Sequence, residues 1–265
     1  MITHLSATPS GGDATKYSFS WTGPNGWTST SQNPTYTPAG GLTAVTQLSF
    51  TVTLSDTYTT KQCTSTITVN PLPTSFDVTG GGGYCSGSTP PNVGLSSSQV
   101  GVSYQLQKDG VDDGSPITGT GSAISFGPKS EAAQYSVVAT STKGCIRTMA
   151  GNAVVTIWPL PVSDAGPDFS INYGMTQQLT GSASGGTTPY QTFAWSPAAQ
   201  INGSATSANP TGNTFAITTK QLYANQTYTF TVTDAHGCTG NNITEVQVGG
   251  DPLSVLPSAT PNAIC

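Results

Sequence analysis

The sequence predicts an all-β chain made of tandem β-sandwich domains. Apolar residues alternate with Ser and Thr in short runs, which is the pattern of strands with one buried face. The same runs recur at a fixed distance along the chain, separated by Gly, Asn and Pro turns. No stretch has apolar residues at helical spacing behind an N-capping residue. We therefore expect separate sandwiches that follow one another in an elongated rod.

The composition excludes several classes of protein. Charged residues make up only 7% of the 265 residues and the net charge is −5, but 35% are hydrophobic and fall in ordered alternation, unlike a disordered chain. The basic residues are scattered, so no cluster could follow a nucleic-acid backbone. No run of 18 apolar residues is present, so we expect no membrane span in this segment. The opening residues lack a signal-peptide pattern, and we expect any export signal to lie outside the segment.

One strand, one cysteine and one junction recur together three times. The strand is Leu48–Leu54, then Tyr135–Ala139, then Tyr228–Val232. A cysteine follows each strand after a polar turn, and a closing strand then leads into a proline-bracketed junction. The cysteines are Cys63, Cys145 and Cys238, and the junctions are residues 71–73, 159–161 and 249–253. Their spacing of roughly ninety residues is close to the length of one sandwich domain.

This spacing predicts where the repeats begin and end. We expect repeats at 1–73, 74–161 and 162–250, with 251–265 as a linker and the start of a further repeat. The first repeat is short and lacks an opening strand, so we expect the segment to come from a longer protein. Prolines at the junctions stiffen the connections.

A central strand is predicted in each repeat. These strands are residues 17–21, 102–106 and 193–195. An inward-facing tryptophan at Trp21 and at Trp195 is typical of an immunoglobulin-like core.

The cysteines predict an extracellular disulfide. Cys85 opens the second repeat and Cys145 follows its penultimate strand, so we expect these two to pair. Metal binding is the alternative, but neither cysteine has a CxxC partner or a histidine at ligand spacing. We expect Cys63, Cys238 and Cys265 to be unpaired or to have partners outside the segment. A bond between Cys238 and Cys265 would require the linker to fold back.

The repeats resemble those of a known class of surface protein. The second repeat, from Tyr84-Cys85-Ser86-Gly87-Ser88 to Lys143-Gly144-Cys145, resembles repeats of the giant SprB-like gliding-motility adhesins of Bacteroidota. The third is similar to the PKD-like and Ig-like repeats of such proteins in the pieces 164–168, 184–186, 195–197 and 232–238. It departs from them at Tyr173, where an opening cysteine is expected.

This resemblance implies a cell-adhesion role. It implies type IX secretion, display on the bacterial cell surface in association with the outer membrane, and a part in gliding motility. The partners it implies are neighbouring repeats of the same chain and surface polysaccharide or substratum. The alternative hypothesis is a carbohydrate-binding or accessory module of a large secreted hydrolase.

No catalytic centre can be assembled from the sequence, so we expect no enzyme activity. The only histidines are His4 and His236, the second of them in a predicted turn, and the only glutamates, Glu131 and Glu245, lie in different repeats. We expect no cofactor except a calcium ion, for which Asp164, Asp168 and Asp234 are the candidate ligands, with turn formation as the alternative role.

Two tryptophans lie outside the predicted strands. Trp27 follows Gly23-Pro24-Asn25-Gly26 in a predicted loop and is the candidate for stacking on a glycan, with packing of the loop as the alternative. Trp158 lies beside a Pro-Leu-Pro junction, and we expect it to pack between domains.

Overall fold

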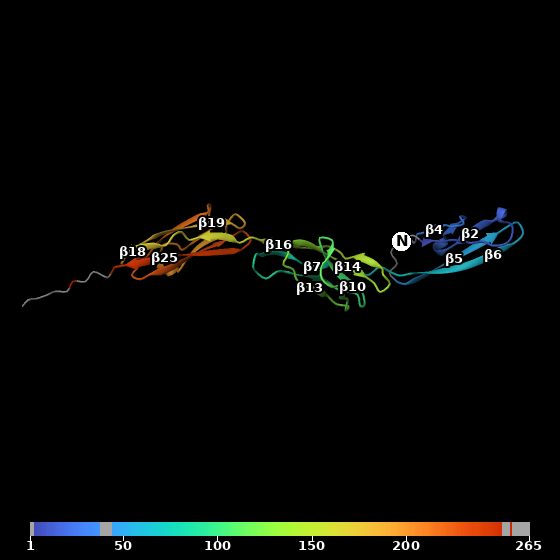
Figure 1. Cartoon of the computed structure of the whole chain (residues 1–265), viewed down its shortest axis with the longest axis horizontal. Helices are drawn as coiled ribbons and strands as arrows, with labels where there is room; N and C mark the ends of the chain where they lie inside the picture. The colour runs from blue at the N-terminus through green and yellow to red at the C-terminus, as the bar shows by residue number, and fades with distance from the viewer. Residues whose placement is uncertain (1–2, 38–43, 251–254, 256–265) are drawn as a thin grey trace, which may run out of the picture. The chain divides into compact units, whose positions relative to one another are not determined.

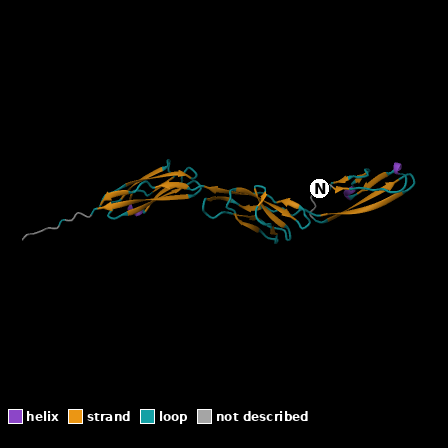
Figure 2. Ribbon diagram, viewed as in Figure 1, coloured by secondary structure: helices purple, strands orange, loops and turns teal. Residues whose placement is uncertain are grey.

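The chain folds almost entirely into strands and turns. The computed structural model describes residues 3–37, 44–250 and 255. Strands, drawn in orange in Figure 2, form its regular structure, and the helical elements of these residues are three short 3-10 turns. These are Ala14–Lys16, Pro24–Gly26 and Ala198–Gln200. None of the described helical turns could cross a membrane. The all-β prediction is confirmed.

The described residues belong to two compact units. Unit 1 comprises Met1–Gly81, Asn92–Lys129 and Ala133–Val154. Unit 2 comprises Gly82–Pro91, Ser130–Ala132 and Val155–Cys265. The predicted repeat boundaries at residues 73, 161 and 250 stay predictions.

Unit 1 begins with sheets built around a long hairpin. Along the larger sheet the strands are β3 (Thr28–Ser29), β2 (Ser18–Thr22), β5 (Thr46–Ser55) and β6 (Thr60–Val69), while β1 (Thr3–His4) pairs with β4 (Thr35–Tyr36). β5 pairs along its whole length with β6, and the pair is visible in light blue in Figure 1. Trp21 and Phe50 are buried between the sheets, as the alternating pattern predicts.

Unit 1 continues with two further sheets. The first contains β11 (Val111–Asp112), β10 (Ser103–Lys108), β14 (Ala133–Thr140) and the start of β16 (Ala153–Trp158), with β12 (Ile117–Thr118) and β15 (Ile146–Thr148) at its side. The residues of β16 from Val155 on belong to unit 2. The second contains β13 (Ile124–Pro128), β9 (Asn92–Leu95) and β7 (Val78–Gly80). Tyr104 and Tyr135 are fully buried on the predicted strands.

Unit 2 contains the C-terminal sandwich. One sheet has the order β17 (Pro161–Asp164), β19 (Gln178–Gly185), β23 (Thr214–Thr219), β21 (Ile201–Asn202). The other has the order β18 (Phe169–Asn172), β25 (Thr239–Gly249), β24 (Gln226–Thr233), β20 (Thr192–Ser196), β22 (Thr206–Ala208). Trp195 and Phe230 pack together in the core between them, with ring centroids 4.9 Å apart.

Two parallel strand pairs stand out among antiparallel neighbours. β8 (Gly82–Cys85) pairs in parallel with the end of β16, and β18 pairs in parallel with the end of β25. In both cases a short strand from the start of a sandwich lies beside its last strand. This arrangement fixes the position of Cys85.

We predict that Phe50→Ala destabilises the first part of unit 1 by about 3–5 kcal/mol, because it removes a buried ring and leaves a cavity. The ring is 0% exposed and packs edge-on against Trp27 and Tyr36. Hydrogen–deuterium exchange of the amides in β5 and β6 measures this local stability. The matched control is Tyr58→Ala, at an 84% exposed ring, for which we expect a change within about 0.5 kcal/mol. Equal exchange in the two variants would contradict the assignment of the core.

Candidate functional site

The candidate site is a cross-linked joint in unit 2. We call Cys85, Trp158, Pro161, His236 and Cys238 the joint. β16 ends at Trp158 and β17 begins at Pro161, so only Pro159 and Leu160 separate the two strands. A connection of two residues, one of them proline, leaves the chain few conformations at this point.

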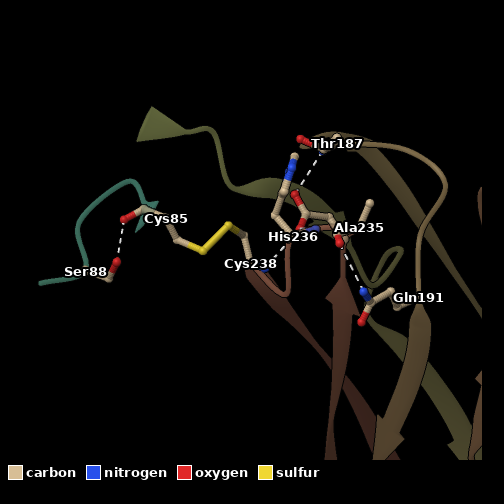
Figure 3. Close-up of a disulfide and its surroundings, with 8 residues drawn as sticks. Cys85, Ser88, Thr187, Gln191, Ala235, His236 and Cys238 are labelled. Atoms are coloured by element: carbon tan, nitrogen blue, oxygen red, sulfur yellow. Dashed lines mark hydrogen bonds between the residues drawn. A yellow bond between two sulfur atoms is a disulfide. The ribbon is translucent and has the colours of Figure 1, made fainter. Parts of the chain in front are cut away.

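A disulfide bond joins Cys85 to Cys238. The two Cα atoms lie 5.5 Å apart, and the residues are separated by 153 positions in the sequence. Figure 3 shows the bond between Cys85, at the end of β8, and Cys238, which lies just before β25 and is 1% exposed. The bond therefore ties β8 to the turn between β24 and β25.

The parallel pairing with β16 places Cys85 at the joint. Cys85 is the register partner of Trp158, and the amide of Ser86 donates a hydrogen bond of 2.8 Å to the Trp158 carbonyl. The Trp158 indole lies over Gly83, where a Cβ atom would come within 2.0 Å of the ring. Only glycine leaves room for the ring, so the glycine-rich strand fits the tryptophan.

An aromatic stack lies beside the disulfide. The rings of Trp158 and His236 lie 3.9 Å apart between centroids and 9° from parallel. Stacked rings add to the stabilisation from buried area. The partner of Trp158 therefore comes from the turn that carries Cys238, and its packing between domains stays a prediction.

A buried carboxylate shapes that turn. Asp234 is 0% exposed. One of its oxygens accepts hydrogen bonds of 2.9 Å from the amides of His236 and Cys238, and the other accepts one of 2.9 Å from the amide of Thr187. The positive φ of the turn falls on Gly237, at 79°. Asp234 thus holds His236 and Cys238 in position by their backbone.

The start of β17 is wedged between glycines. A Cβ atom on Gly240 would lie 2.0 Å from the Pro161 carbonyl oxygen, and one on Gly186 would lie 3.0 Å from Pro161 Cα. The backbone of the junction therefore lies directly against β25. The disulfide, the stack and this close backbone contact act on the same few residues.

The predicted bond between Cys85 and Cys145 is wrong, and so is the expectation that Cys238 has no partner within the chain. The parallel register sets Asp77 level with Ala150 and Cys85 level with Trp158. Cys85 therefore lies about eight residues, or about 25 Å of strand, beyond Ala150, while Cys145 precedes Ala150. A disulfide needs Cα atoms within about 7 Å.

Cys63 and Cys145 are free cysteines, and Cys265 lies outside the described residues. Cys63 is exposed within β6, opposite Val52. It does not occupy the position of Cys145, because the preceding turn closes earlier, around Asp56. Hydrogen bonds from the amides of Thr59 and Tyr58 hold this turn and lower the pKa of Asp56 below its usual value.

Each of the three acids named as calcium candidates accepts hydrogen bonds from backbone amides. Asp164 accepts a bond from Gly166, and Asp168 accepts one of 2.7 Å from the amide of Glu245. The described part of the chain holds no group of three His, Cys, Asp or Glu side chains that could share a metal ion. The structure does not bring the candidates together, and calcium binding stays a prediction.

Trp27 packs on the core of unit 1. Its ring lies edge-on to Tyr36 and Phe50, with centroids 5.6 Å and 5.7 Å apart, and it is half-buried. These contacts favour the loop-packing role over the glycan contact, which stays a prediction.

Comparisons with known proteins give fold likeness only. No protein-family model and no curated protein matches the chain. An I-band fragment of titin is 11% identical, with a TM-score of 0.41, covering 94% of this chain and 93% of that one. Immunoglobulin domains 1–4 of Sidekick-1 are 13% identical, with a TM-score of 0.35, covering 94% and 72%. Fibronectin(III)-like modules of CbhA from Clostridium thermocellum are 13% identical, with a TM-score of 0.35, covering 65% and 94%.

We predict that Asp234→Ala destabilises the β24–β25 hairpin by at least about 3 kcal/mol, because it leaves three amides without their acceptor. Chemical unfolding of unit 2, together with the fraction of Cys85 found in the disulfide, measures the effect. Asp164→Ala is the control, since Asp164 is exposed and accepts a bond from Gly166 at the surface. We expect the control to cost less than about 1 kcal/mol. Equal losses would show that Asp234 does not organise the turn.

Proposed function

We propose that this chain is a structural repeat segment of a secreted cell-surface adhesin, with the joint as the element that transmits tension. It forms part of the stalk that carries the adhesive tip and takes part in gliding motility. The disulfide from Cys85 to Cys238 carries the proposal, because it links two sandwich elements that are far apart in the sequence.

The disulfide changes the path that a pulling force takes through the chain. Tension applied to the two ends passes from β8 through the sulfur atoms to β25. The residues between Cys85 and Cys238, a separation of 153 positions, carry no tension while the bond is intact. The buried residues Tyr104 and Trp195 lie in this protected stretch. A segment that transmits force between a cell and its substratum benefits from such a path.

Two observations favour an extracellular location. Structural disulfides persist in oxidising compartments and are rare in the cytosol. Charged residues are only 7% of the chain, so few surface ion pairs exist for salt to screen. The family resemblance adds type IX secretion and association with the outer membrane to the proposal. Neighbouring repeats and surface polysaccharide are the proposed partners.

Labelling of intact cells tests the adhesin role. Antibodies against this chain should bind the cells that produce it without permeabilisation, and deletion of the segment should weaken attachment to a surface. Labelling only after permeabilisation, or unchanged attachment, would contradict the proposal.

We predict that single-molecule pulling from the two ends of the oxidised chain yields less extension than pulling of the Cys238→Ser variant. Release of the protected stretch should add about 500 Å of contour length, at ~3.5 Å per residue over the separation of 153. A reducing agent should give the same gain with the unmodified chain. Cys63→Ser is the control and should leave the extension unchanged, because Cys63 is free. An oxidised chain that already extends to the full length would contradict the proposal that tension passes through the disulfide.

A further inference from the structure

The turn that carries Cys145 repeats the turn that carries Cys238, bond for bond. In the β24–β25 turn the amide of Asp234 donates to the Cys238 carbonyl, and the amide of Gly237 donates to the Asp234 carbonyl. In the β14–β15 turn the amide of Ser141 donates to the Cys145 carbonyl, and the amide of Gly144 donates to the Ser141 carbonyl.

The side-chain bonds of the two turns also correspond. Ser141 Oγ accepts from the amides of Lys143 and Cys145, as Asp234 Oδ1 accepts from those of His236 and Cys238. Cys145 is therefore held in the same way as a cysteine that forms a disulfide.

The surroundings of Cys145 correspond as well. Cys238 forms its disulfide with Cys85, which is the register partner of Trp158. Trp158 is the residue directly before Pro159. Asn70 holds the same place before the other Pro-Leu-Pro junction, and Cys145 Sγ lies 3.8 Å from the Asn70 carbonyl oxygen. A partner placed beside Asn70, as Cys85 is beside Trp158, would be within reach of Cys145.

Among the described residues, no strand lies beside β6 to present this partner. In unit 2, β8 lies in parallel against the end of β16, and β18 lies in parallel against the end of β25. Among the described residues β6 pairs with β5 alone and forms the edge of its sheet. Its outer edge presents unpaired backbone groups of the kind that accept an added strand.

We propose that the outer edge of β6 is the docking site for an extended, cysteine-bearing strand joined ahead of β1, and that the cysteine of this strand forms a disulfide with Cys145. The occupant is placed ahead of β1 because β8 directly precedes β9 in the chain and β18 directly precedes β19. β1 corresponds to these two strands, since it pairs with β4 as β9 pairs with β13 and β19 pairs with β23. The proposal rests on the repeated geometry of the joint, and it holds whether or not the chain acts as an adhesin.

The reaction is an ordinary thiol–disulfide exchange. The strand's thiol and the Cys145 thiol form one disulfide, and a small-molecule disulfide such as oxidised glutathione is reduced to two thiols. The two electrons and two protons lost by the protein thiols go to the two glutathione molecules.

The test grafts a second copy of residues 82–91, the chain's own cysteine-bearing strand, in place of residues 1–2. After oxidation with glutathione, peptide mapping of the monomer should find the grafted cysteine bonded to Cys145, with Cys63 still free. The Cys145→Ser graft is the control and should leave the grafted cysteine without this partner. A grafted cysteine that is free, bonded to Cys63 or bonded to a second chain overturns the proposal. An intact Cys85–Cys238 bond in the same molecules verifies folding.

A second measurement does not depend on folding of the graft. The peptide of residues 82–88, carried as its glutathione mixed disulfide, is added to the unaltered chain. Plain oxidised glutathione should prefer Cys63, which is exposed, to the half-buried Cys145. The peptide should shift the ratio of Cys145 to Cys63 modification by at least about tenfold, because strand pairing raises its local concentration. The same ratio for both reagents overturns the proposal.

Discussion

The joint of unit 2 depends on the parallel pairing of β8 with β16. This pairing sets Cys85 beside Trp158, and from there one covalent bond reaches Cys238. A disulfide alone fixes one distance and leaves rotation about it. The stack of Trp158 on His236 and the close contact of Pro161 with Gly240 remove that freedom, and a connection of two residues leaves little slack. Each contact is modest, but all of them act on one short stretch of backbone.

The same turn is built from different side chains in two places. Ser141 and Asp234 both accept from amides two and four residues later, so the turn requires a short side chain with an oxygen acceptor at its first position. Asp234 also has a second oxygen, which binds the amide of Thr187 and links the turn to the end of β19. The aspartate therefore anchors the turn to the sandwich beneath it, and this extra anchor occurs where the joint is cross-linked.

The strands could be predicted from the sequence, but the partners of the cysteines could not. Alternation along β5, β14 and β24 is a local property, and the structure confirms it, with Trp21 and Trp195 buried as predicted. The pairing of Cys85 depends on the register of β8, whose glycines give no alternating pattern at all. Cys63 lies four residues beyond Thr59, which closes the preceding turn as Cys145 closes its own, so Cys63 falls within the strand.

The position of the disulfide also determines what proteolysis can do to this chain. Exposed turns between Cys85 and Cys238, such as the one at Asp109 and Gly110, are natural sites for a protease. A cut there breaks the backbone but releases no fragment, because the sulfur bridge still connects the two pieces. Loss of the distal part then requires a reductant as well as a protease, or a cut outside the bridged stretch. A nicked molecule outside the cell would remain tethered.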